Sequence, residues 1–211
     1  MATQIKLLPK EGALLEDRQA VVRVLLRDVY YHKVKWDKRH DSSIDMNLDY
    51  KPPGPIAKAF MKDESFVRGI RGPVGSGKSV TCCMEIMRRA VNQAPNSAGV
   101  RRTRWAVIRN TNPQLKTTTI KTWRDWFGDE VGKFVWSPPY THLVNFSLAD
   151  KTSVECEVIF LALDKQEDVK KLLSLELTGV WLNEARELPK SIVDACTMRC
   201  GRFPSMSCLL Y

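Results

Sequence analysis

Residues 72–79 read GPVGSGKS, and this stretch decides the fold. It matches the phosphate-binding pattern G-x-x-x-x-G-K-[ST] in full. The glycines let the backbone wrap closely, so that successive N–H groups point at phosphate oxygens. An apolar stretch at 66–70 precedes the loop and an amphipathic helix follows it, which is the context that the pattern requires. We therefore expect nine residues to contact ATP: Gly72, Pro73, Val74, Gly75, Ser76, Gly77, Lys78, Ser79 and Val80.

Two side chains of this loop carry specific roles. Lys78 is a flexible point charge that can reach the β and γ phosphates. Ser79 supplies a hydroxyl to Mg²⁺. The helix that begins here directs its positive end at the bound anion.

Outside the loop, apolar strands alternate with helical patterns. Strands are predicted at 66–70, 105–108, 143–148, 154–163 and 179–182. Helices are predicted through 82–87 and at 117–127, 165–175 and 190–198. This alternation favours an α/β fold with a mainly parallel central sheet flanked by helices.

The N-terminal region has a different pattern. Apolar positions at helical spacing in 13–31 predict an amphipathic helix. The run KPPGP at 51–55 then interrupts any regular element. We therefore expect a small helical N-terminal arm at 1–50 and a phosphate-loop domain at 51–211.

Composition limits the function classes. The net charge is +9, from 33 Lys and Arg against 24 Asp and Glu, which suits a polyanionic partner such as nucleic acid or, alternatively, a basic protein without one. No apolar run approaches the length of a membrane span, and no secretory signal is evident. The six cysteines form no C-x-x-C pair and are expected to be buried, reduced thiols of an intracellular protein.

The second half of an ATPase site is expected at the end of a buried strand. Residues 180–184 read VWLNE, about a hundred residues after Lys78. Glu184 is the candidate general base that polarises the attacking water. Asn183 stands where an Asp is usual, and its amide can still hold a magnesium-bound water. The alternative interpretation is a plain strand end at a turn.

Longer segments resemble the ATPase domain of phage terminase large subunits, which package DNA into procapsids. The resemblance covers roughly residues 50–204 and rests on three segments: FVRGIRGPVGSGKS, RWAVIRNTNPQLKTTTIKTWRDWF and EVIFLALDKQEDVKKLLSLELTGVWLNEARELP. It implies a P-loop NTPase fold of the additional-strand (ASCE) type. It also implies ATP hydrolysis coupled to translocation of double-stranded DNA.

The resemblance also implies partners and location. These are a homo-oligomeric ring, usually of five subunits, together with the portal protein and the small terminase subunit. The expected location is the host cell cytoplasm, with transient docking at the procapsid portal and no membrane association. Carried over by position, Lys78 and Ser79 contact phosphate and Mg²⁺, Asn183 is a metal-side variant and Glu184 is the catalytic carboxylate. Arg109 matches a family arginine near the nucleotide and is the third expected catalytic residue beside Lys78 and Glu184.

This sequence departs from the family in two places. Many relatives carry an arginine inside the phosphate loop, whereas here the nearest one is Arg71, just before it. A charge-stabilising finger is therefore expected from an adjacent subunit, and the candidates are Arg109, Lys171, Arg199 and Arg202. The last residues, SMSCLLY, match neither the next core strand of the family nor its nuclease domain. We expect a truncated or interrupted form that lacks the nuclease domain and in which no coupling strand is recognisable.

Two other functions fit the same residues. One is a RecA-like helicase or another nucleic-acid-dependent ATPase. The other is a nucleotide- and DNA-binding module without turnover, because its coupling strand would be missing. Basic residues at 101–109 and at 116–124 could contact DNA, although such groups are more often a solvated surface.

Overall fold

The computed structural model describes residues 50–204 and 208–210. The helix predicted within 13–31 lies outside these residues, as does nearly all of the predicted N-terminal arm. None of the described helices combines the length and apolar character needed to cross a bilayer.

The described residues build one seven-stranded sheet in the order β1-β7-β6-β2-β5-β4-β3. The first five strands of this order are parallel, and β4 and β3 run antiparallel as an added hairpin. The strands are β1 (Val67–Arg68), β2 (Val100–Arg109), β3 (Gly132–Val135), β4 (Tyr140–Ser147), β5 (Ser153–Ala162), β6 (Gly179–Leu182) and β7 (Cys208–Leu210).

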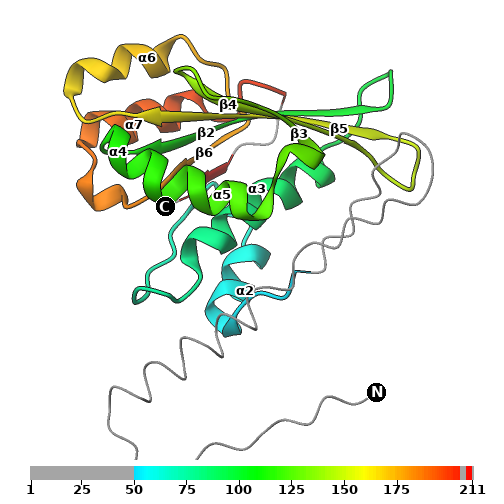
Figure 1. Cartoon of the computed structure of the whole chain (residues 1–211), viewed down its shortest axis with the longest axis horizontal. Helices are drawn as coiled ribbons and strands as arrows, with labels where there is room; N and C mark the ends of the chain where they lie inside the picture. The colour runs from blue at the N-terminus through cyan, green and yellow to red at the C-terminus, as the bar shows by residue number, and fades with distance from the viewer. Residues whose placement is uncertain (1–49, 205–207, 211) are drawn as a thin grey trace, which may run out of the picture. The chain divides into compact units, whose positions relative to one another are not determined.

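Helices cover both faces of the sheet (Figure 1). They are α2 (Gly54–Lys62), α3 (Lys78–Asn92), α4 (Asn112–Gln114), α5 (Lys121–Trp126), α6 (Val169–Leu173) and α7 (Lys190–Arg199). A π-helical turn, Leu115–Ile120, joins α4 to α5. Short 3₁₀ turns occupy Asp129–Val131, Gln166–Asp168 and Ala185–Glu187.

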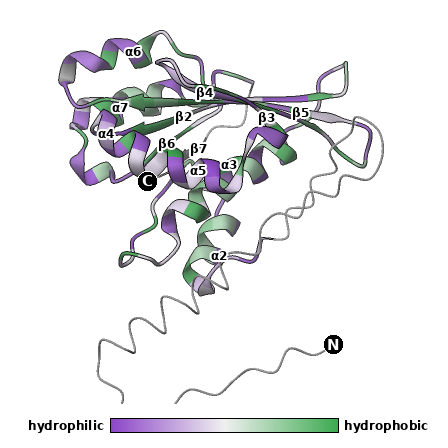
Figure 2. Cartoon of the chain, viewed as in Figure 1, coloured by the Kyte–Doolittle hydropathy of each residue, from purple (hydrophilic) through white to green (hydrophobic). Residues whose placement is uncertain are grey.

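Each face of the sheet has its own hydrophobic core. Helices α2, α3 and α5 pack on the face that carries Trp105, Val107 and Phe160. Helices α6 and α7 pack on the face that carries Ala106 and Ile108. All four residues of β2 at positions 105–108 are therefore fully buried, which explains their continuous apolar run. Figure 2 shows the same division, with hydrophobic central strands and helices that are hydrophilic on their outer sides.

The predicted fold class is confirmed: the sheet is mainly parallel and flanked by helices. The strand predicted at 179–182 coincides with β6, and the helix predicted at 190–198 is α7. Helix α2 and strands β3 and β7 were not predicted. Helix α2 begins inside the Pro-rich run, because a proline is compatible with the first turn of a helix. Strand β3 is only four residues long and carries little pattern.

The expectation that the last residues form no core strand is wrong. Cys208–Leu210 is β7, and it pairs in parallel with β1 on one side and with β6 on the other. Strand β7 is thus inserted between the phosphate-loop strand and the strand that ends at Leu182, just before Asn183. This insertion is the feature that defines the additional-strand fold predicted from the resemblance.

A buried ionic cluster joins β1 to α3. Glu85 is fully buried and accepts from three arginines: Arg68 Nη2 at 2.8 Å, Arg88 Nε at 2.7 Å and Arg89 Nε at 2.9 Å. Arg68 also donates to the carbonyls of Phe60 and Asp63 at the end of α2. The cluster therefore links the end of α2, strand β1 and helix α3, the elements on either side of the phosphate loop.

Four of the six cysteines lie in the core, and Cys200 is half-buried. Cys82, Cys83, Cys156 and Cys196 are all buried. Burial raises the pKa of both Cys156 and Cys196 to about 12, so these thiols stay protonated at neutral pH.

Candidate active site

The two halves of the predicted site follow the carboxyl ends of parallel strands. The phosphate loop follows β1, and Asn183 follows β6. In open α/β sheets, ligands bind at this edge of the sheet. Strand β7 lies between the two, so the ends of β1 and β6 are two strand spacings, roughly 10 Å, apart.

Backbone conformation explains the glycines of the loop. Gly75 and Gly77 have φ values of +78° and +80°, which side-chain-bearing residues rarely adopt. Gly72 is needed for a different reason, because a Cβ there would lie 2.9 Å from Ser76 Oγ. The loop thus folds tightly enough to present its N–H groups on one concave side.

Lys78 is held over the loop by backbone oxygens alone. Its Nζ donates to the carbonyls of Gly72 and Pro73, each at 2.8 Å, and Ser76 Oγ donates to the second of these carbonyls. No carboxylate among residues 50–204 and 208–210 pairs with the ammonium group. An incoming phosphate can therefore replace two neutral acceptors without breaking an ion pair.

The strand end carries the polar residues of the other half. Glu184 has a left-handed backbone, with φ at +59°, which is unusual for a residue with a side chain. Its side chain is 39% exposed, and its carboxylate lies 3.6 Å from Arg186 Nε. Asn183 donates from Nδ2 to Thr119 Oγ1 at 2.8 Å, which connects the strand end to the π-helical turn.

One pocket of about 750 Å³ brings most of the predicted residues together. From the loop it includes Gly72, Pro73, Val74, Lys78 and Ser79, and from the strand end Asn183 and Glu184. The predicted residues Gly75, Ser76, Gly77 and Val80 do not line it. Arg71 and Arg186 do line it, and both can place positive charge near a bound anion.

Arg109 lies behind the site and does not line the pocket. Its side chain is buried, with 8% of the residue's surface exposed. It donates from Nη1 to the Asn183 carbonyl at 3.2 Å, and its Nη2 lies 3.5 Å from Glu187. From this place it fixes the backbone of the strand end, while direct contact with nucleotide stays a prediction.

The residues present fit ATP and Mg²⁺. The pocket volume falls within the range usual for small-molecule sites. The Ser79 hydroxyl makes no hydrogen bond within the described part of the chain, so it is available to a cation. Within the same residues no three His, Cys, Asp or Glu side chains converge. A divalent cation would therefore be held jointly with phosphate, as is usual for Mg²⁺.

Two residues of this site were not predicted. Thr119 is 64 positions from its partner Asn183, so no local pattern indicates the contact. Arg186 follows Glu184 by two positions, and its place in a loop after a buried strand was the available signal. Among the finger candidates, Lys171 pairs with Asp168 at 2.6 Å and lines a different cavity.

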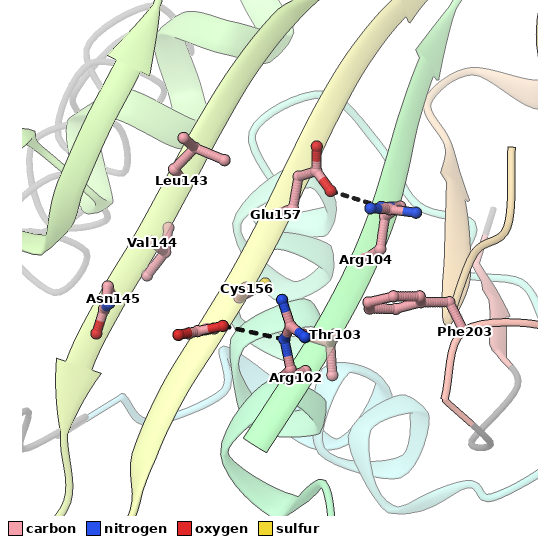
Figure 3. A pocket seen from close by; sticks show the side chains of 10 residues that line it. Arg102, Thr103, Arg104, Leu143, Val144, Asn145, Cys156, Glu157 and Phe203 are labelled. Atoms are coloured by element: carbon pink, nitrogen blue, oxygen red, sulfur yellow. Dashed lines mark hydrogen bonds and ion pairs between the residues drawn. The ribbon is translucent and has the colours of Figure 1, made fainter. Parts of the chain in front are cut away.

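A second, smaller depression of about 220 Å³ lies on the sheet between β2, β5 and β4 (Figure 3). Arg102 and Arg104 line it, and each pairs with a glutamate of β5, Glu155 or Glu157. The Arg104 guanidinium also lies 4.4 Å from the centre of the Phe203 ring. These two arginines belong to the basic group that could contact DNA, and both are already partnered within the domain.

Solved structures with a similar fold are large terminases of bacteriophages. No family model and no curated protein matches the sequence. The large terminase of a thermophilic bacteriophage matches with a TM-score of 0.52 and 13% identity, over 71% of this chain and 34% of that chain. The same terminase in complex with ADP gives 0.51 and 13%, over 72% and 34%. The large terminase ATPase domain of a Thermus phage gives 0.49 and 15%, over 77% and 65%.

The matched region spans about a third of the length of the thermophilic phage terminase. At this level of identity the likeness concerns the fold. The described residues therefore have the fold of phage large terminases, as the resemblance in sequence predicted.

Proposed function

We propose that this chain is the ATPase domain of a phage large terminase and couples ATP hydrolysis to the movement of double-stranded DNA into a procapsid. One observation carries the proposal. A single pocket joins Lys78 and Ser79 of a complete phosphate loop to Asn183 and Glu184 at the end of β6. A protein that only binds nucleotide through this loop would not need Asn183 and Glu184 in the same pocket.

Each residue has a defined task in this proposal. The loop N–H groups and Lys78 bind and orient the β and γ phosphates. Glu184 accepts a proton from the attacking water, and its exposed carboxylate at the pocket is available for this. Ser79 and Asn183 would hold Mg²⁺ together with ATP, and the cation would supply charge neutralisation at the phosphates.

Charge on the γ-phosphate then needs one more positive group. In P-loop enzymes such a finger is worth roughly 10³–10⁵ in rate. Arg71 and Arg186 line the pocket in this chain. Arg199 and Arg202 remain candidates from a neighbouring subunit in a ring.

The partners of the proposal are those of a packaging motor. They are double-stranded DNA, the portal protein, the small terminase subunit and further copies of this chain in a ring. The proposed location is the host cell cytoplasm, with transient docking at the portal. The competing idea of a module without turnover depended on a missing coupling strand. Strand β7 supplies a core strand beside β6, which favours the proposal over this alternative.

The direct test removes the loop ammonium. Lys78→Ala should weaken ATP binding strongly, as measured by fluorescence titration, and abolish phosphate release. Lys190→Ala is the matched control, because Lys190 is 87% exposed and does not line the pocket. Equal ATP affinity in the parent and in Lys78→Ala would refute the phosphate-loop assignment.

A further inference from the structure

We propose that Thr119 is a positioning residue, which turns the Asn183 side chain so that its amide oxygen faces the pocket as the metal-side group. The inference rests on the proposed ATPase function and deepens it. It explains how a neutral amide serves where a carboxylate is usual.

Three of the four polar groups of Asn183 are already engaged. Its backbone N–H donates to the Ile108 carbonyl at 2.9 Å, and its carbonyl accepts from Arg109 at 3.2 Å. Its Nδ2 donates to Thr119 Oγ1 at 2.8 Å. In the part of the chain that the structure describes, no group donates to Oδ1. The amide oxygen is therefore the group left for a ligand.

Thr119 draws the amide nitrogen away from the pocket. Thr119 is 1% exposed and does not line the pocket, whereas Asn183 does. The nitrogen and oxygen of an amide diverge from the same carbon. Since the nitrogen points at a buried hydroxyl, the oxygen is turned toward the pocket side.

Hydrogen bonds along the π-helical turn fix the direction of this contact. Thr118 Oγ1 donates to the Gln114 carbonyl at 2.6 Å, so its hydrogen is used. Its oxygen lies 3.5 Å from Thr119 Oγ1, a long contact in which it can accept, and this favours a Thr119 hydrogen turned toward Thr118. Thr119 then offers a lone pair to Asn183, and an amide nitrogen can satisfy it whereas an amide oxygen cannot.

An asparagine needs such a partner and an aspartate does not. The two oxygens of a carboxylate are equivalent, so either one can face a cation. A flipped amide would present N–H groups to the cation and repel it. Groups that orient a metal's ligands typically contribute 10- to 100-fold to metal affinity.

The test compares ADP affinity with Mg²⁺ and with EDTA, using a fluorescent ADP and no turnover. The ratio of the two dissociation constants is the gain due to Mg²⁺. Thr119→Val should reduce this gain by roughly 10- to 100-fold and leave the affinity in EDTA unchanged. Thr119→Ser keeps the hydroxyl and should retain the gain.

A second pair of variants avoids the core. Thr118 and Thr117 are both exposed on the same turn, and Thr117 bonds to the Pro113 carbonyl instead. Thr118→Val should lower the gain and Thr117→Val should not. In an Asn183→Asp background, Thr119→Val should have no effect on the gain.

The outcomes separate this proposal from the proposed function. An unchanged gain in Thr119→Val, or an equal loss in the Asn183→Asp background, overturns the positioning role while ATP binding stands. A parent protein that binds no ADP at all overturns the proposed function itself.

Discussion

At the scale of single residues, the strained backbone of Glu184 is the most telling feature. A left-handed conformation costs a residue with a Cβ about 1 kcal/mol or more. The protein maintains it at the point where a strand ends in a pocket. Strain of this kind is concentrated at functional sites, because it places a side chain where an ordinary turn would not.

Glu184→Gln should separate binding from chemistry. The amide keeps the shape of the side chain but cannot accept the proton of the attacking water. Steady-state phosphate release should fall by about 10²–10⁴, while ATP affinity with Mg²⁺ stays close to that of the parent. Glu167→Gln is the control, because Glu167 is exposed and lies outside the pocket. Full turnover in Glu184→Gln, together with an inactive Asn183→Ala, would reverse the two assigned roles.

The sequence predicted the site only where the chemistry is local. Lys78, Ser79, Asn183 and Glu184 stand in short motifs whose spacing carries the signal, and the pocket brings all four together. The contact between Thr119 and Asn183 depends on how distant segments pack, so no sequence motif predicts it. Arg109 was placed on the correct strand, but the burial that keeps it out of the pocket is a tertiary property.

At the scale of elements, the cluster around Glu85 fixes α3 against the phosphate-loop strand. Burial raises the pKa of Glu85, but hydrogen bonds from Arg88 and Arg89 and the charge of Arg68 outweigh it and hold the pKa below its usual value. Glu85 is therefore the buried carboxylate shared by three guanidinium groups, whereas Glu64 pairs with Arg88 and Arg89 from the surface. Removing Glu85 takes the buried negative charge away from Arg68 and Arg89, which are themselves buried.

Glu85→Ala should lower the free energy of unfolding by about 3–5 kcal/mol, measured by urea denaturation. Asp194→Ala is the matched control. This change removes an exposed i,i+4 ion pair with Lys190 and should lower the free energy of unfolding by no more than about 0.5 kcal/mol. A loss in Glu85→Ala as small as that of the control would show that the cluster does not stabilise the fold.

The same carboxylate gives a pH dependence with a definite sign. Its folded pKa lies below the unfolded value of about 4.3, so ionised Glu85 stabilises the fold above that value. The contribution is lost as the pH falls through the folded pKa. The unfolding free energy of the parent should therefore fall more steeply below about pH 4.3 than that of Glu85→Gln.

Helices and strands with a longer apolar pattern were easier to predict from the sequence. The apolar run of β6 and the periodicity of α7 identified both correctly. Strands β3 and β7 are four and three residues long, too short to carry a period. Their places are decided by the neighbouring strands that offer them hydrogen bonds, which is information outside the segment itself.

At the scale of the whole molecule, the charge excess is the feature that bears on DNA. Residues 1–49 hold nine Lys and Arg against eight Asp and Glu, so the excess lies almost entirely in 50–211. Several arginines there are neutralised, including Arg102 by Glu155 and Arg124 by Asp129. Exposed lysines such as Lys116 and Lys121 then remain as candidates for phosphate contacts.

Binding to double-stranded DNA should be independent of sequence, with log affinity falling linearly with log salt by about 0.9 for each phosphate contact. Lys121→Ala should reduce that slope by about 0.9, as measured by fluorescence anisotropy. Arg102→Ala should leave it unchanged, because the Arg102 charge is already paired. An affinity that is constant between low and physiological salt would exclude this electrostatic mode.

The position of β7 also bears on how the domain assembles. Within the described residues, β1 joins the sheet through β7 alone, and Val67 pairs with Leu209. Closing so long a stretch of chain is entropically costly and slow, since nothing stabilises it until both ends meet. Strand β1 should thus be among the last parts of the sheet to acquire its native hydrogen bonds. A partly folded chain would hold most of its sheet before the phosphate loop was anchored at its β1 end.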